Sequence, residues 1–180
     1  MGSLGAKLRT LRKGQKLSLK QAAERIGCAP SYLSMVENDK VDPSISRLKK
    51  IAEGLGSTIV KLFEENADDE VVMRKAKRPR ASFARSKLRI ELLVPRGPQR
   101  QMDARLAIVG PGGGSQGDYQ HEGEEFGLIL EGALELTIEG VSYTLRQGDS
   151  FYFRSTQDHR FTNPGDKDCR ILWVNHPPSW

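Results

Sequence analysis

The sequence contains few cysteines and histidines and no long apolar stretch. Among its 180 residues are two cysteines and three histidines. Cys28 and Cys169 lie far apart and fit no metal-binding or redox spacing, so two reduced thiols in a cytosolic protein are expected. No stretch approaches the roughly 20 apolar residues that cross a bilayer, and the N-terminus lacks the apolar core of a signal peptide. We therefore expect a cytoplasmic protein with no membrane segment.

Charge is distributed unevenly along the chain, which carries a net charge of +5. Residues 1–65 contain 12 Lys and Arg against 7 Asp and Glu, and residues 66–100 contain 10 against 4. Residues 101–180 reverse this balance, with 6 against 12. The basic residues 1–100 favour a polyanionic partner, and the acidic residues 101–180 favour a cationic ligand. Solubility alone would explain the acidic half equally well.

Residues 1–65 have the pattern of five short helices separated by brief turns. Ser18 and Gln21 form a capping box that opens a helix lasting to Ile26, and Gly27 closes it. Pro30 suits the first turn of a third helix that continues to Asn38. The other expected helices are a first with Leu4, Leu8 and Leu11 on one face, a fourth that Ser44 caps and Gly56 ends, and a fifth from Ser57 to near Phe63.

From Leu88 onward the pattern is typical of strands, with a period of two and glycine turns. Leu134, Leu136 and Ile138 alternate with polar residues, and Glu139-Gly140 predicts a hairpin. Short strands at regular spacing indicate a sandwich or barrel. Because the helices precede the strands, the predicted fold class is α + β in two domains. The expected divisions are a helical domain at 1–65, a basic linker or edge strand at 66–87 and a β domain at 88–180.

The second and third helices, joined by the turn at 27–29, predict a helix-turn-helix. Residues 17–38, above all the core Ser-Tyr-Leu-Ser-x-x-Glu-Asn, resemble the phage-repressor-like (Cro-type, or XRE) family. The resemblance covers residues 4–63 and implies a five-helix, lambda-repressor-like DNA-binding domain in which Glu37 pairs with Arg12 as part of the scaffold. One departure is Ala29, which stands where the family usually has a Ser or Thr cap. The alternative is a helical bundle that binds another protein.

In this arrangement the third helix enters the major groove, and its inner face is expected to be core through Leu33 and Val36. The residues expected to meet bases or phosphates on its outer face are Pro30, Ser31, Ser34 and Met35. The residues expected to contact phosphates are Lys20, Tyr32, Asn38 and Lys40.

Two motifs in the second half resemble those of the cupin superfamily. The first is Gly117-x3-His121-x3-Glu125-x6-Gly132, and the second is Gly148-Asp149 followed by His159-x3-Asn163. The resemblance implies a double-stranded β-helix (jelly-roll) barrel, in which a His-x-His pair, a Glu and a distant His hold a metal. His121, Glu125 and His159 keep that spacing, but Tyr119 replaces the first histidine. Two further changes, Arg154 and Thr156, replace the Pro and Gly of the second motif.

These four barrel residues leave two hypotheses open. His121, Glu125 and His159 form a 2-His-1-carboxylate set that suits Zn or Fe, and the chain would then be a metal-dependent enzyme with a DNA-targeting head. Alternatively, a barrel that lost its metal keeps a ligand pocket of Tyr119, His121, Glu125 and His159. A carboxylate and aromatic faces attract amines, with about 0.5–2 kcal/mol for each cation–π contact. Tyr119 favours the second hypothesis, and a purely structural, hydrogen-bonded His159 is a further alternative.

The two halves together resemble the helix-turn-helix–cupin regulators, and most closely the putrescine-utilisation repressor group. The runs at 121–132 and 170–178 carry that likeness. It implies a repressor of amine, polyamine or amino-acid catabolism that is released when a small-molecule effector binds. Since one helix in one groove reads too few base pairs, we expect a homodimer or a higher even oligomer on a palindromic operator, with the barrel forming the dimer. A DNA binder with an inert barrel is the third alternative.

Overall fold

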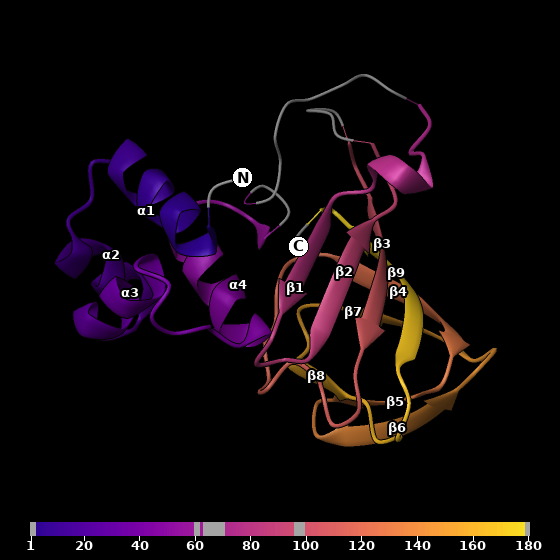
Figure 1. The fold of residues 1–180 in the computed structure, drawn as a ribbon. Helices are drawn as coiled ribbons and strands as arrows, with labels where there is room; N and C mark the ends of the chain where they lie inside the picture. The colour runs from indigo at the N-terminus through magenta and orange to yellow at the C-terminus, as the bar shows by residue number, and fades with distance from the viewer. Residues whose placement is uncertain (1–2, 60–61, 63–70, 96–99, 179–180) are drawn as a thin grey trace.

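Helices and strands occupy separate halves of the molecule, as Figure 1 shows for the computed structural model. The structure describes residues 3–59, 62, 71–95 and 100–178. The helices are α1 (Leu4–Gly14), α2 (Leu19–Ile26), α3 (Pro30–Glu37) and α4 (Ile45–Gly54), with a 3-10 turn at Lys75–Lys77. The strands are β1 (Arg80–Phe83), β2 (Leu88–Leu92), β3 (Asp103–Val109), β4 (Glu124–Glu131), β5 (Ala133–Ile138), β6 (Val141–Arg146), β7 (Ser150–Arg154), β8 (His159–Thr162) and β9 (Cys169–His176). None of the helices in these ranges is long and apolar enough to cross a membrane.

The helical half, called the head below, has the boundaries that its capping residues predict. The Ser18 hydroxyl accepts a hydrogen bond from the Gln21 amide at 3.2 Å, and the Gln21 side chain accepts one from the Ser18 amide at 2.9 Å. Gly27 ends α2 with a φ of 73°, in the left-handed region that glycine adopts at little cost. Of the expected fifth helix, Ile59 and Leu62 are helical and buried, and the residues at 60–61 and 63 lie outside the described ranges.

Close contact between α1 and α3 builds the core of the head. A Cβ on Gly5 would lie 2.5 Å from the Val36 carbonyl oxygen, so only glycine allows this approach. Leu8 and Leu33 are fully buried beneath it. The start of α3 has no side-chain cap because Ala29 occupies the cap position, as the sequence predicts, and Pro30 takes the first helical position.

The second half is a barrel of two antiparallel sheets. One sheet has the order β1-β2-β3-β9-β4-β7, and the other has the order β6-β5-β8. The predicted hairpin at Glu139-Gly140 joins β5 to β6, with φ values of 48° and 79° that match a type I′ turn. The basic segment at 66–87 supplies, in its described part, the 3-10 turn and the edge strand β1, which pairs with β2.

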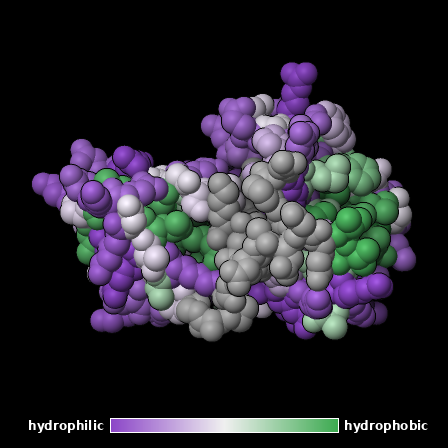
Figure 2. Space-filling model, turned by 90° about the horizontal axis from the view of Figure 1, so that it is seen from above, coloured by the Kyte–Doolittle hydropathy of each residue, from purple (hydrophilic) through white to green (hydrophobic). Residues whose placement is uncertain are grey.

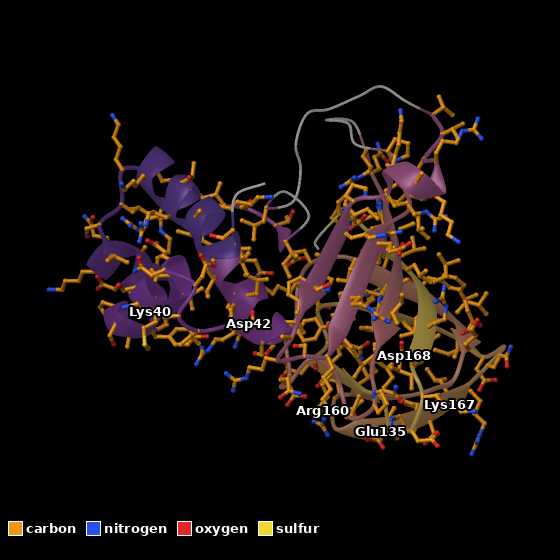
Figure 3. The ribbon with its side chains drawn as sticks, viewed as in Figure 1. Lys40, Asp42, Glu135, Arg160, Lys167 and Asp168 are labelled. Atoms are coloured by element: carbon orange, nitrogen blue, oxygen red, sulfur yellow. The ribbon has the colours of Figure 1, made fainter. Side chains whose placement is uncertain are left out.

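The first turn of α4 is hydrogen-bonded to the barrel, a contact that the sequence did not predict. The Ile45 amide donates to the Ser86 hydroxyl at 3.1 Å, and the Ser46 amide donates to the Ser115 carbonyl at 3.4 Å. Just before α4, the Asp42 carboxylate accepts a bond from the Arg85 amide at 3.4 Å; Figure 3 shows Asp42 on the side of the head that faces the barrel. One face of α4 therefore packs in the head and another faces the β domain.

Candidate functional sites

The predicted DNA-contacting residues lie in or next to the helix-turn-helix of the head. α2 and α3 are joined by the turn at 27–29 in helix-turn-helix geometry, with Leu33 and Val36 buried on the inner face of α3. The outer side chains are exposed or half-buried; they are Lys20, Pro30, Ser31, Tyr32, Ser34, Met35, Asn38 and Lys40. Figure 3 shows Lys40 beside the head, on the far side of Asp42 from the barrel. Their individual contacts with DNA stay predictions.

The predicted scaffold pair between Arg12 and Glu37 is confirmed. Arg12 Nε lies 2.7 Å from Glu37 Oε1, and Arg12 Nη2 lies 2.8 Å from Glu37 Oε2. The hydrogen bond to Glu37 raises the pKa of Arg12 above its ordinary value. Arg12 also donates to the Leu17 carbonyl at 2.8 Å, so this one guanidinium fixes α1 to both α3 and the start of α2.

A positively charged groove between the head and the barrel adds basic residues that the sequence analysis missed. The cavity measures about 410 Å³, and its lining residues are Tyr32, Ser44, Ser46, Arg47, Lys50, Arg85 and Gln116. Arg47 lies over the Tyr32 ring at 6.0 Å from its centroid. Arg47 and Lys50 are one helical turn apart on α4 and exposed, which is the available signal that they belong to a basic face. They extend the cationic surface beside the outer face of α3.

Tyr119, His121, Glu125 and His159 meet inside the barrel, where the cupin resemblance places them. The Tyr119 and His159 ring centroids are 4.2 Å apart, and the Tyr119 and His121 rings stack at 6.3 Å with an angle of 10°. Phe153 adds a further ring 4.8 Å from His159. Tyr119 and His121 thus point inward together, as alternation along an extended segment predicts.

Glu125 is the centre of this cluster and is fully buried. One of its oxygens, Oε1, lies 2.5 Å from His121 Nε2 and accepts a bond from Asn175 Nδ2 at 2.6 Å. The other, Oε2, accepts a bond from Trp173 Nε1 at 2.7 Å. Burial alone would raise the pKa of Glu125, but the hydrogen bond from His121 and the nearby positive charges hold it well below its ordinary value. The carboxylate is therefore ionised and firmly positioned.

Two buried cations lie beside Glu125, so the barrel interior is less acidic than the sequence led us to expect. Lys49 of α4 is buried, with Nζ 5.0 Å from the centroid of the Tyr119 ring. Burial lowers the pKa of Lys49 to about 7, against the opposing pull of Glu125. Arg105 of β3 is also buried, with its guanidinium 5.6 Å from the Trp173 ring centroid and 3.7 Å from the Asp103 carboxylate. The interior is thus aromatic, and its two carboxylates are balanced by two cations below about pH 7, where Lys49 is protonated.

The geometry for a metal is only partly suitable. The ligand atoms of His121, Glu125 and His159 all lie within 4.8 Å of one another, and His159 Nε2 is 3.9 Å from Glu125 Oε1. Both Glu125 oxygens already accept hydrogen bonds, however, and Lys49 and Arg105 bring two positive charges next to the single carboxylate of the set. A divalent cation entering here would be repelled by both. In this arrangement the residues do not fit a resident Zn or Fe ion.

A second cavity borders the cluster at His121. It measures about 520 Å³, and its lining residues are Glu53, Thr58, Gln120, His121, Glu122, Thr156, Pro177 and Pro178. We call it the vestibule. Its head side is formed by the end of α4 and the residues after it, and His121 is the member of the cluster that lines it. Two carboxylates, Glu53 and Glu122, line the vestibule, so its charge favours cations.

Comparisons with known proteins match both halves of the chain. Residues 8–62 match a helix-turn-helix family, and residues 105–175 match the cupin domain family. The chain is 30% identical over 177 residues to the HTH-type transcriptional regulator PuuR of Escherichia coli (strain K12), covering 98% of this chain and 96% of that protein. These matches confirm the two-domain fold class and the resemblance to helix-turn-helix–cupin regulators.

Solved structures share the arrangement of the whole chain. An HTH_3 family transcriptional regulator from Vibrio cholerae matches with a TM-score of 0.75 at 22% identity, covering 97% of this chain and 95% of that one. The hydroxypropylphosphonic acid epoxidase from S. wedmorenis matches with a TM-score of 0.51 at 20% identity, covering 96% of each chain. Both identities are low, so these two likenesses show the fold alone.

Proposed function

Because this chain belongs to the helix-turn-helix transcriptional regulators that carry a C-terminal cupin domain, we propose that a small amine bound in its barrel controls how its head binds DNA. The observation that carries the proposal is the position of α4, which lies against the barrel beside the buried cluster around Glu125. A ligand can shift an equilibrium only by its differential affinity for the two states. A helix of the DNA-binding head in contact with the ligand site supplies that difference.

The chemistry of the barrel supports an amine as the effector. Glu125 is ionised, and the aromatic faces of Tyr119 and His159 lie beside it. A primary ammonium in such a place gains both an ion pair and a cation–π contact of about 0.5–2 kcal/mol. The vestibule adds Glu53 and Glu122 on the way in. We propose that amines, polyamines or amino-acid derivatives bind here and release the protein from its operator, so that it acts as a repressor of their catabolism.

A thermal-shift screen of the full chain tests the effector class. We expect putrescine and related amines to raise the Tm, because they bind the folded barrel and not the unfolded chain. Zn²⁺ and Fe²⁺ belong in the same screen. Stoichiometric metal binding that is lost in His159→Ala would favour a metal-dependent enzyme instead, since the ligand atoms of His121, Glu125 and His159 lie within 4.8 Å of one another. No response to any small molecule would favour a DNA binder with an inert barrel.

An apolar outer face of the larger sheet supports a homodimer formed by the barrel. Leu172 on β9 pairs in register with Leu106 on one side and Leu128 on the other, and Phe126 pairs with Tyr152. Phe126 and Tyr152 are 41% and 63% exposed, although such large side chains are usually buried. Figure 2 shows hydrophobic side chains gathered at the barrel end of the molecule, away from the head. We propose that a second copy covers this face, since a two-fold protein suits a palindromic operator.

Phe126→Asp is expected to dissociate this dimer, because it places a charge in the centre of the buried interface. In light scattering coupled to size exclusion, the mass should fall from twice the 20.1 kDa chain mass to the chain mass. Val141→Asp is the matched control: Val141 is 54% exposed but lies on the smaller sheet. If Phe126→Asp remains dimeric while Val141→Asp becomes monomeric, the interface is on the other sheet.

A further inference from the structure

Lys49 belongs to the head, but its ammonium group lies among the residues of the barrel. Its neighbours on α4, Leu48 and Ile51, are fully buried in the hydrophobic core. Lys49 leaves the helix in another direction, and its Nζ lies 5.0 Å from the centroid of the Tyr119 ring. The side chain is 2% exposed. A long cationic side chain that could reach solvent from a helix surface is instead held in the β domain.

The place that Lys49 occupies is the one best suited to an amine. Its ammonium faces the Tyr119 ring and interacts electrostatically with Glu125. The vestibule begins one helical turn further along α4, at Glu53. An amine that enters through the vestibule therefore approaches a site where the Lys49 ammonium already faces the Tyr119 ring and interacts with Glu125. A second ammonium cannot share that position, because the buried Lys49 side chain already fills the space beside the ring.

We propose that Lys49 is a tethered occupant of the effector site, and that an entering ammonium takes its place and frees α4 from the barrel. This inference rests on the proposed function, in which an amine is the effector. A tethered group competes at an effective concentration of order millimolar. This exchange couples the two domains directly, because the site in the barrel holds either the Lys49 side chain of the head or the effector amine. The contacts of Ile45 and Ser46 with the barrel would then form or break with barrel occupancy.

Three variants of the full chain separate occupancy from charge. Lys49→Ala removes both the ammonium and its aliphatic stem, whereas Lys49→Met removes the charge and keeps a stem that fills most of the space. Lys13→Ala removes one charge from an exposed position on α1 and serves as the control. The probes are n-butylamine, which replaces the missing side chain, and butan-1-ol, its neutral counterpart. Binding is measured by calorimetry, and circular dichroism checks that each variant is folded.

We expect Lys49→Ala to bind n-butylamine at least tenfold more tightly than the original chain, and Lys49→Met and Lys13→Ala to stay within threefold of it. Butan-1-ol should show no such preference. If Lys49→Met gains as much as Lys49→Ala, loss of a repelling charge explains the effect and the tethered-occupant proposal is wrong. It is equally wrong if Lys49→Ala gains nothing.

Putrescine binding to the unsubstituted chain separates this proposal from the proposed function. One outcome is that putrescine and other amines fail to bind that chain while n-butylamine binds Lys49→Ala. In that case the amine-binding position occupied by Lys49 exists, and the proposed function with an amine effector is wrong. If putrescine binds both chains with the same Kd, the amine function stands and displacement of Lys49 is refuted. Hydrogen exchange gives the conformational readout: putrescine should speed exchange of the Ile45 and Ser46 amides in the unsubstituted chain, and unchanged rates at saturation would contradict release of α4.

Discussion

Glu37→Ala is expected to unfold the head and abolish operator binding, while the barrel stays folded. The carboxylate makes two hydrogen bonds to Arg12, of 2.7 and 2.8 Å, and is 3% exposed. Its removal leaves the Arg12 guanidinium buried without its carboxylate, and breaking a buried pair in this way costs about 3–5 kcal/mol. A domain of this size has a total stability of a similar magnitude. Circular dichroism at 222 nm should lose most of the helical signal.

Two further variants test whether the effect of Glu37→Ala comes from loss of the buried pair with Arg12. Glu24→Ala removes an exposed carboxylate from α2 and should change stability by less than about 0.5 kcal/mol. Arg12→Met combined with Glu37→Leu removes both charges and should recover most of the helical signal, because apolar groups of similar volume often replace a buried pair without loss. A folded Glu37→Ala head with ordinary operator affinity would show that the pair contributes little.

Helix boundaries in the head could be predicted because their causes are local. Ser18 and Gln21 satisfy each other's backbone amides within one turn, and Gly27 provides the left-handed conformation that ends α2. The same holds for the hairpin at Glu139-Gly140, where two consecutive residues need positive φ. In each case the residues that decide the structure lie within four positions of one another, so the sequence carries the whole signal.

The contents of the barrel could be predicted only in part. Tyr119, His121, Glu125 and His159 belong to motifs of fixed spacing, whereas Lys49 becomes part of the cluster through contact between two domains. The apolar stripe of α4 describes its packing in the head and says nothing of a second partner. Arg105 was missed for another reason: β3 is apolar on both faces, at Leu106 and Ile108 as well as Ala107 and Val109, so alternation does not identify its inward side.

The second large effect is expected for Glu125→Gln, which should destabilise the barrel by about 3–5 kcal/mol, the range for a buried charge that loses its partner. Lys49 and Arg105 would remain buried, with Glu53 as the remaining carboxylate that acts on Lys49 and Asp103 as the one beside Arg105. The hydrogen bonds from Trp173 and Asn175 would then point at a neutral amide, and such bonds are weaker than those to a carboxylate. Urea denaturation at pH 7 measures the loss, and the Tm increase with amines should disappear.

Coupling between Glu125 and Lys49 can be measured separately, because Lys49→Met removes the cation that Glu125 offsets. In the double variant Glu125→Gln, Lys49→Met, we expect at least 1 kcal/mol less destabilisation than the sum of the single changes, within the range found for residues in contact. Glu131→Gln, an exposed change on the same strand β4, controls for the loss of one negative charge. Additive effects at Glu125 and Lys49 would mean that the two charges do not interact across the domain contact. In that event the stability of the barrel would depend on Glu125 through His121, Trp173, Asn175 and the charge of Arg105.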